Sequence, residues 1–200
     1  MRVLVVYPLD SAPTAVTFKA GLEIAKALKE RGYDVDELPH IYATHLSFLL
    51  KEMLRRSDAL AYLGHGVSFG LVGQMPFNIV KMFVDLSTKH LVRDKIVVTV
   101  ACNTFKKFGK ECPARVYFGS EHFMCVAFPT ADHNYTADFI DTWKVLVLSA
   151  LEKDPYRALK DYKDVCTHYI RLYERMRWEG WDVYSYALRI NRDYYRVRVK

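Results

Sequence analysis

Two residues in this sequence have side chains suited to nucleophilic catalysis by a thiol. Cys102 directly follows the apolar run IVVTVA (96–101), and His65 follows the apolar run DALAYL (58–63) and one glycine. A thiolate attacks a carbonyl carbon, while a neighbouring imidazole accepts the thiol proton and passes it to the leaving group. We therefore expect His65 and Cys102 to form a catalytic pair.

The backbone around this pair can stabilise the negative charge that such an attack produces. A tetrahedral oxyanion needs hydrogen-bond donors aimed at it. Gly66 follows His65, and a glycine lets a substrate approach its backbone N–H closely. We expect the N–H groups of Gly66 and Cys102 to form the oxyanion hole.

The pair can meet only if the two apolar runs are neighbouring strands of one sheet. Apolar runs alternate with amphipathic segments over the first two-thirds of the chain, which is typical of an α/β protein. We expect strands at 2–7, 33–38, 58–63, 96–101 and 123–128, and helices at 14–31, 44–57, 76–91, 136–152 and 154–177. Residues 67–73 have the glycines of a small hairpin, and residues 181–200 have the pattern of a second hairpin.

These elements predict a three-layer α/β sandwich with a mostly parallel sheet. Right-handed crossovers favour a strand order of about 2-1-3-4-5. Ligand sites of such sheets lie beyond the carboxyl ends of the strands, and adjacent strands are about 4.8 Å apart. His65 and Cys102 would then lie side by side. We expect residues 1–152 to form the core, with the C-terminal helix and β-hairpin of residues 153–200 packed on it.

The order and surroundings of the pair resemble those of the caspase-like cysteine peptidases. An apolar strand–His–Gly followed by an apolar strand–Ala–Cys is the double signature of that superfamily, and the closest likeness is to CHAT domains. The matching segments are FGLVG (69–73), the helix from Pro76, VACNT (100–104), PARVYFGSE (113–121), FMCVAFP (123–129) and TADHNYTADF (130–139). The likeness spans about residues 1–152.

This resemblance implies a caspase-like fold and a cysteine endopeptidase that acts on a peptide or protein substrate without a cofactor. It places the catalytic histidine at His65 and the nucleophile at Cys102. In CHAT proteins the loop after the fifth strand often carries an acidic residue, and here that loop holds Asp132 and His133. Both are candidate substrate-binding residues, and a carboxylate at the pocket floor would favour Arg or Lys. In the alternative interpretation, Asp132 caps the helix that follows Asn134.

Two other functions fit the same residues. A caspase-like domain can serve as a non-catalytic interaction module, in which Cys102 is a small core thiol. The segment VLVVYPLDSAPT (3–14) superficially resembles the phosphate loop of a flavodoxin-like small-ligand-binding domain, although it lacks the glycine that would cradle a phosphate. Fast alkylation of Cys102 near neutral pH would favour the enzyme, and a yellow protein would favour the flavin binder.

Composition restricts the remaining classes. The 200 residues, 51% of them hydrophobic, suffice for one domain with a sizeable core. The four cysteines have no C-x-x-C spacing and the histidines are scattered, so we expect no metal site. The net charge of +6 is concentrated in the arginine-rich tail, which we interpret as a solvated face rather than a nucleic-acid interface.

The sequence also predicts a cytoplasmic protein with no membrane partner. Its first apolar run is too short for a signal peptide, and no run reaches the length of a membrane span. A single glutamine, with few asparagines against many Lys, Arg and Glu, is typical of a thermophile. The pattern leaves a homo-oligomer open and does not define the substrate.

Overall fold

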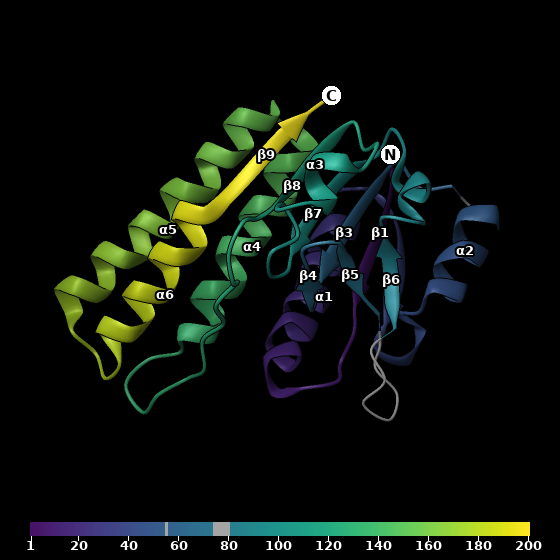
Figure 1. The fold of residues 1–200 in the computed structure, drawn as a ribbon. Helices are drawn as coiled ribbons and strands as arrows, with labels where there is room; N and C mark the ends of the chain where they lie inside the picture. Colours follow the sequence, from purple (N-terminus) through teal and green to yellow (C-terminus); the bar gives the residue numbers. More distant parts are fainter. Residues whose placement is uncertain (55, 74–80) are drawn as a thin grey trace.

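The computed structural model describes residues 1–54, 56–73 and 81–200 (Figure 1). The strands are β1 (Arg2–Tyr7), β2 (Asp34–Pro39), β3 (Ala59–Leu63), β4 (Gly66–Val67), β5 (Gly70–Val72), β6 (Met82–Asp85), β7 (Ile96–Val100), β8 (Val116–Ser120) and β9 (Tyr195–Val199). The helices are α1 (Ala12–Glu30), α2 (His45–Leu54), α3 (Phe108–Glu111), α4 (Tyr135–Glu152), α5 (Pro155–Met176) and α6 (Trp181–Tyr194), with 3-10 turns at His40–Tyr42 and Lys89–Val92. The alternation of strands and helices confirms the predicted α/β class.

The main sheet has the strand order β2-β1-β3-β7-β8-β9, and a small sheet has the order β4-β5-β6. Parallel pairs join β1 to β2 and β3, β3 to β7, and β7 to β8, whereas β9 is antiparallel to β8. The first four positions agree with the predicted order. The main sheet is therefore mostly parallel, and its crossovers bring several loops to one edge.

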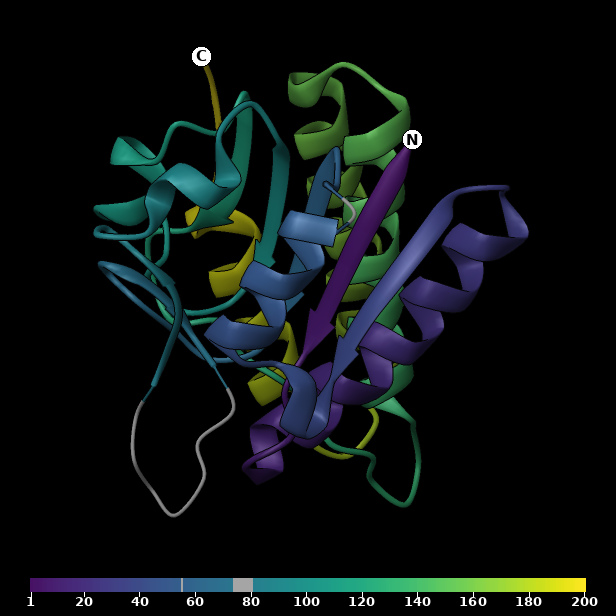
Figure 2. The same ribbon diagram turned by 90° about the vertical axis from the view of Figure 1, so that its right-hand side faces the viewer.

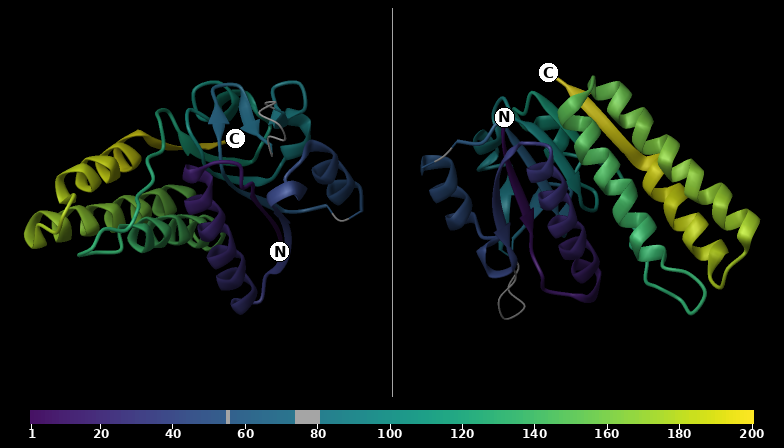
Figure 3. Two further views of the ribbon diagram at one scale, coloured as in Figure 1. Left: turned by 90° about the horizontal axis from the view of Figure 1, so that it is seen from below. Right: turned by 180° about the vertical axis from the view of Figure 1, so that it is seen from behind.

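Alternate residues of the central strands face two separate cores. Val3 and Val5 of β1 belong to the core beneath α1 and α4, whereas Leu4 and Val6 belong to the core beneath α2 and the small sheet. This division follows from the two-residue period of a strand. Figures 2 and 3 show the same layers: α1 and α4 lie on one side of the sheet, and the small sheet and α3 lie on the other.

The predicted fifth strand at residues 123–128 is wrong, because β8 is the neighbour of β7. Residues 123–128 instead run in extended form past Cys102, where the Asn191 side chain bonds the backbone of Cys125. The Cys125 N–H donates to Asn191 Oδ1 at 2.8 Å, and Asn191 Nδ2 donates to the Cys125 carbonyl oxygen at 2.9 Å. Both stretches are apolar, so periodicity cannot separate them. Residues 116–120 form the strand because they also pair with β9, which is distant in the sequence.

The predicted C-terminal hairpin is also wrong, because its first half is helix α6. The buried residues of α6 are Ser185, Ala187, Leu188 and Asn191, which have the spacing of one helix face. The second half, β9, pairs with β8 rather than with its own neighbours in the chain. Figure 1 shows α4, α5 and α6 side by side, with β9 returning to the sheet.

Among the described residues, none of the helices combines the length and the apolar character that a membrane span needs.

The helix predicted at residues 76–91 is absent from the part of it that the structure describes, 81–91. β6 pairs with β5 in antiparallel fashion and extends the small sheet. The Asp85 carboxylate then accepts hydrogen bonds from the N–H groups of Ser87 at 2.9 Å and Thr88 at 3.1 Å, which forms a turn. Residues 76–80 of the predicted helix lie outside the described residues. The small hairpin predicted at 67–73 is present as β4 and β5.

Candidate active site

His65 and Cys102 lie at the carboxyl ends of neighbouring strands. β3 pairs with β7 in parallel, and Leu63 lies opposite Val100. Each candidate residue is two positions beyond its member of this pair, and the Gly64 N–H donates to the Val100 carbonyl oxygen at 3.1 Å. The prediction that the two strands are adjacent and parallel is confirmed.

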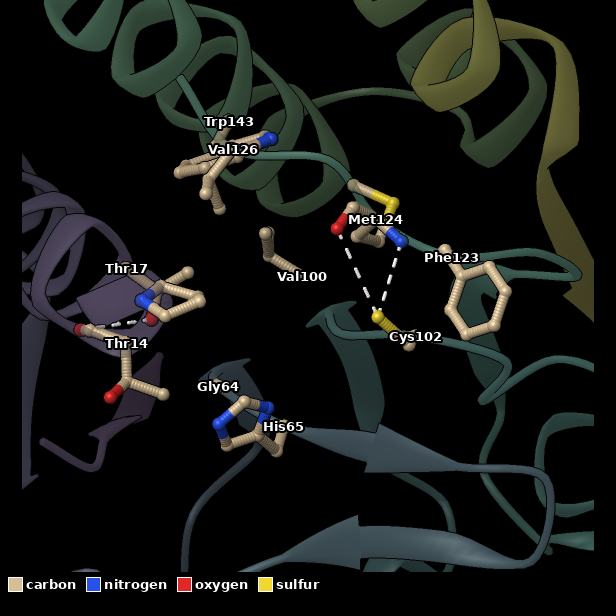
Figure 4. A pocket seen from close by; sticks show the side chains of 11 residues that line it. Thr14, Thr17, Gly64, His65, Val100, Cys102, Phe123, Met124, Val126 and Trp143 are labelled. Carbon is tan, nitrogen blue, oxygen red and sulfur yellow. Dashed lines mark hydrogen bonds between the residues drawn. The ribbon is translucent and has the colours of Figure 1, made fainter. Parts of the chain in front are cut away.

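Both side chains border one cavity of about 200 Å³ at this edge of the sheet (Figure 4). Its walls come from four parts of the chain: the start of α1, the ends of β3 and β7, the extended segment after β8, and α4. The lining residues are Pro13, Thr14, Thr17, Gly64, His65, Val100, Cys102, Phe123, Met124, Val126 and Trp143. The cavity therefore combines a thiol, an imidazole and a largely apolar wall.

The ring of His65 is held on one side by the residues that begin α1. Its Nε2 lies 3.0 Å from Ser11 Oγ and 3.5 Å from Asp10 Oδ1. Thr14 Oγ1 donates to the same Asp10 oxygen at 2.9 Å, and the Asp10 side chain is only 3% exposed. Figure 4 shows one ring nitrogen on the Thr14 side and the other on the Cys102 side. With Nε2 hydrogen-bonded to Ser11 Oγ and 3.5 Å from Asp10 Oδ1, Nδ1 is the nitrogen that can exchange a proton in the cavity.

This arrangement depends on where α1 starts. We expected a helix at 14–31, but the helix starts at Ala12 and Ser11 is its N-cap. Ser11 and Thr14 form a capping box, in which each side chain bonds the other's backbone N–H. The cap therefore fixes Ser11 beside Nε2 of His65.

A buried tyrosine holds the backbone of His65 in place. The Tyr62 hydroxyl donates to the His65 carbonyl oxygen at 2.9 Å and is also in contact with the Val72 carbonyl oxygen. A Cβ on Gly64 would lie 2.7 Å from Pro8 Cγ and 2.8 Å from the Tyr62 hydroxyl. A side chain at position 64 would therefore force Pro8 or Tyr62 to move.

The Cys102 sulfur is bound to the extended segment rather than to His65. It accepts a hydrogen bond from the Met124 N–H at 3.2 Å, and the thiol donates to the Met124 carbonyl oxygen across 3.9 Å. Burial raises the pKa of the Cys102 thiol, and the bond from Met124 opposes that shift. Within the described ranges, no hydrogen bond joins the Cys102 sulfur to the His65 ring. The raised pKa favours the protonated thiol, which must lose its proton before the sulfur attacks a carbonyl carbon.

The Gly66 N–H points away from the hairpin that contains it. The Val72 N–H donates to the His65 carbonyl oxygen at 3.1 Å, which makes His65 and Val72 a hydrogen-bonded pair of the β4–β5 ladder. The next pair, Gly66 and Leu71, is then the non-bonded kind, in which both N–H groups point outward. This direction leaves the Gly66 N–H free of β5, as an oxyanion donor requires.

The packing at the end of β7 accounts for the residue types at positions 66 and 103. A Cβ on Gly66 would lie 2.7 Å from the Cys102 carbonyl oxygen and 2.5 Å from Thr104 Cγ2, so the hairpin touches the end of β7. Asn103 has a φ of 57°, a left-handed conformation that asparagine adopts more readily than most residues. The chain thus turns sharply after Cys102 and leaves the sulfur at the cavity.

Asp132 and His133 lie outside the lining of this cavity. The Asp132 carboxylate accepts from the Glu179 N–H at 3.2 Å. His133 stacks on Trp178 with ring centroids 3.9 Å apart, and its Nε2 lies 2.5 Å from Asp138 Oδ2. The alternative expectation for Asp132 is wrong, because Asn134 caps α4 through a bond from the Ala137 N–H at 3.3 Å.

The sequence reasoning missed Asp10 and the apolar wall of the cavity. Asp10 comes three residues after β1, whose carboxyl end is at the same sheet edge as those of β3 and β7. An acidic residue soon after a buried parallel strand is a signal that could have found it. Phe123, Met124 and Val126 were instead assigned to a strand.

The side chains in the described ranges offer no cluster of three or more His, Cys, Asp or Glu that could hold a metal ion. The reactive side chains at the cavity are the Cys102 thiol and the His65 imidazole, with the Asp10 carboxylate next to the ring. No protein-family model and no curated protein matches this sequence.

Proposed function

We propose that this chain is a cysteine endopeptidase of the caspase-like, CHAT-related kind. The observation that carries the proposal is the single cavity bordered by both His65 and Cys102, at the ends of adjacent parallel strands. The buried carboxylate of Asp10, 3.5 Å from Nε2 of His65, supports it, because a nearby negative charge stabilises an imidazolium.

In the first half of the reaction, Nδ1 of His65 takes the proton of the Cys102 thiol as the sulfur attacks the peptide carbonyl carbon. The carbonyl oxygen becomes an oxyanion, and the N–H groups of Gly66 and Cys102 stabilise it. When the C–N bond breaks, the imidazolium gives its proton to the departing amine. The acyl group is left as a thioester on Cys102.

In the second half, His65 removes a proton from a water molecule that attacks the thioester carbon. The S–C bond breaks, the carboxylic acid leaves, and the proton returns to the sulfur. Asp10 stabilises the imidazolium in both halves and keeps Nδ1 as the nitrogen that exchanges protons. Neither half requires a metal or an organic cofactor.

A non-catalytic interaction module is the second candidate, and one observation favours it. Burial raises the pKa of the Cys102 thiol, and the sulfur is bonded to the Met124 backbone, as in a structural cysteine. In that case His65 would have no influence on the reactivity of the thiol.

The dependence of thiol alkylation on His65 separates the two candidates. We expect iodoacetamide to alkylate Cys102 faster than Cys125, which is also partly exposed, because His65 can accept the Cys102 proton. The His65→Ala variant should lose most of this advantage. Peptide mass spectrometry at several reaction times gives the rate for each cysteine.

His90→Ala is the matched control, because His90 is exposed and lies on the 3-10 turn before β7. It should leave the rates of both cysteines unchanged. Equal rates for Cys102 and Cys125 in the wild type, with no change in His65→Ala, would contradict the peptidase and favour the interaction module.

A further inference from the structure

The cavity beside Cys102 is apolar over most of its surface. Six of its lining residues have apolar side chains: Pro13, Val100, Phe123, Met124, Val126 and Trp143. His65 is the one titratable group there besides the thiol, and no Asp, Glu, Lys or Arg belongs to the lining that the described residues form. The wall therefore offers no partner to a charged side chain.

The two threonines of the lining do not change this character. Thr17 Oγ1 donates to the Thr14 carbonyl oxygen at 3.2 Å, and Thr14 Oγ1 donates to Asp10 Oδ1 at 2.9 Å. Both hydroxyl protons are thus used inside α1 and its cap. A ligand in the cavity would meet mostly the carbon atoms of this wall.

The size of the cavity suits a medium-sized side chain. Its volume is about 200 Å³. An engineered apolar cavity of roughly 150 Å³ in another protein binds benzene. The side chain of Leu, Met or Phe would therefore fit.

We infer that this cavity binds an uncharged, apolar side chain of the substrate, on the residue whose carbonyl carbon Cys102 attacks. The inference rests on the proposed peptidase function. It assigns the cavity to the acyl side because Phe123, Met124 and Val126 belong to the segment whose backbone bonds the Cys102 sulfur. The acyl group becomes attached to that sulfur, whereas the leaving amine takes its proton from His65.

A basic side chain would have to reach a carboxylate elsewhere. Asp132, the residue we expected at a pocket floor, binds the Glu179 N–H and lies outside the lining. Asp10 is nearly fully buried against Thr14 and His65. Placing an unpaired charge against the apolar wall is costly, so Arg, Lys, Asp and Glu should be rejected.

The test uses peptidyl acyloxymethyl ketones that differ only in the side chain next to the ketone: Leu, Met, Phe, Arg or Asp. The Cys102 thiolate forms an S–C bond to the methylene carbon and a carboxylate leaves, so intact-protein mass spectrometry counts the labelled molecules. We expect the Leu, Met and Phe probes to react at least about tenfold faster than the Arg and Asp probes.

A pair of variants tests the wall itself. Phe123 lines the cavity and is 62% exposed, whereas Phe128 is on the same segment, is 45% exposed and lies outside the lining. Both positions are exposed enough to solvent to accept a charged side chain. Phe123→Glu should raise the rate of the Arg probe relative to the Leu probe by about tenfold, and Phe128→Glu should leave that ratio unchanged.

The inference is overturned if the Arg or Asp probe is as fast as the Leu probe in the wild type, or if Phe128→Glu shifts the ratio as much as Phe123→Glu. An Arg preference that disappears in Asp10→Asn would assign the pocket to Asp10 instead. In these cases His65-dependent alkylation by iodoacetamide would still support the peptidase. Loss of that dependence would instead remove the proposed function.

Discussion

The described residues include two histidine–aspartate pairs, which occupy different environments. His133 and Asp138, at the start of α4, are in contact through Nε2 and Oδ2 at 2.5 Å. His65 and Asp10, at the carboxyl edge of the sheet, are 3.5 Å apart through Nε2 and Oδ1. In both places Nε2 is the ring nitrogen that approaches the carboxylate, but Nε2 of His133 is hydrogen-bonded to Asp138, whereas Nε2 of His65 is hydrogen-bonded to Ser11 Oγ.

The surroundings of the two pairs differ in what they leave open. The ring of His133 is stacked on Trp178 with an interplanar angle of 6°, and the Tyr173 hydroxyl donates to Asp138 Oδ2 at 2.8 Å. The His65 ring borders a cavity, and Asp10 Oδ2 is buried without a hydrogen-bond partner in the described part of the chain. The first pair is enclosed by packing, whereas the second borders a cavity that the Cys102 thiol also borders.

The largest expected difference between the pairs is in peptide hydrolysis. His65→Ala should lower kcat by a factor of about 10⁴ or more, because the thiol loses the base that takes its proton. His133→Ala should leave kcat unchanged, because its ring is enclosed by aromatic side chains. A fluorogenic peptide with Leu before the scissile bond reports both rates. Equal losses in the two variants would break the comparison, and a raised KM in His133→Ala would restore its predicted substrate-binding role.

Replacing the two aspartates should separate activity from stability. Asp10→Asn should lower kcat by about 10- to 100-fold, because the amide no longer stabilises the imidazolium. Its free energy of unfolding should change by less than about 1 kcal/mol, because a neutral amide costs less to bury than a carboxylate. Urea unfolding and initial rates measure the two effects.

Asp138→Asn should show the opposite pattern. It loses charge-assisted hydrogen bonds to His133 and Tyr173, which should lower the free energy of unfolding by about 1.5–3 kcal/mol and leave kcat unchanged. A fall in kcat without loss of stability in this variant would show that the α4 pair takes part in the reaction.

The smallest expected effect is a shift in the pH at which two thiols react. Burial raises the pKa of Cys166, under the helical layer, to about 12, and it raises the pKa of Cys102 as well. A thiol with a raised pKa forms its thiolate only at higher pH. In His65→Ala, alkylation of Cys102 should therefore have its midpoint above the ordinary cysteine pKa of about 8.5. Cys166 should react only at higher pH.

Rates of iodoacetamide labelling between pH 6 and pH 11, resolved by cysteine, check this order. In the wild type, the labelling of Cys102 should begin at lower pH than in His65→Ala, because His65 accepts the proton. Coincident profiles for wild type and variant would show that the imidazole has no access to the thiol.

Local sequence predicted much of this fold. The helices at 136–152 and 154–177 were predicted almost to the residue, because an apolar face at helical spacing and an Asp-Pro start are local signals. The strands that end before His65 and Cys102 were also predicted, because continuous apolar runs are a local signal as well. What the local pattern could not provide was the choice between residues 116–120 and 123–128 as the strand next to β7.

By itself, the sequence determined the α/β class, the positions of His65 and Cys102 at two strand ends, and their expected adjacency, because crossover rules leave few arrangements of short apolar strands. Only the tertiary structure decided that Asp10 lies 3.5 Å from the His65 ring and that Asp132 and His133 lie outside the lining of the cavity. It also decided that the cavity wall is apolar. These features depend on contacts between segments far apart in the chain, such as Asp10 with His65 and Cys125 with Asn191, and no local pattern records such contacts.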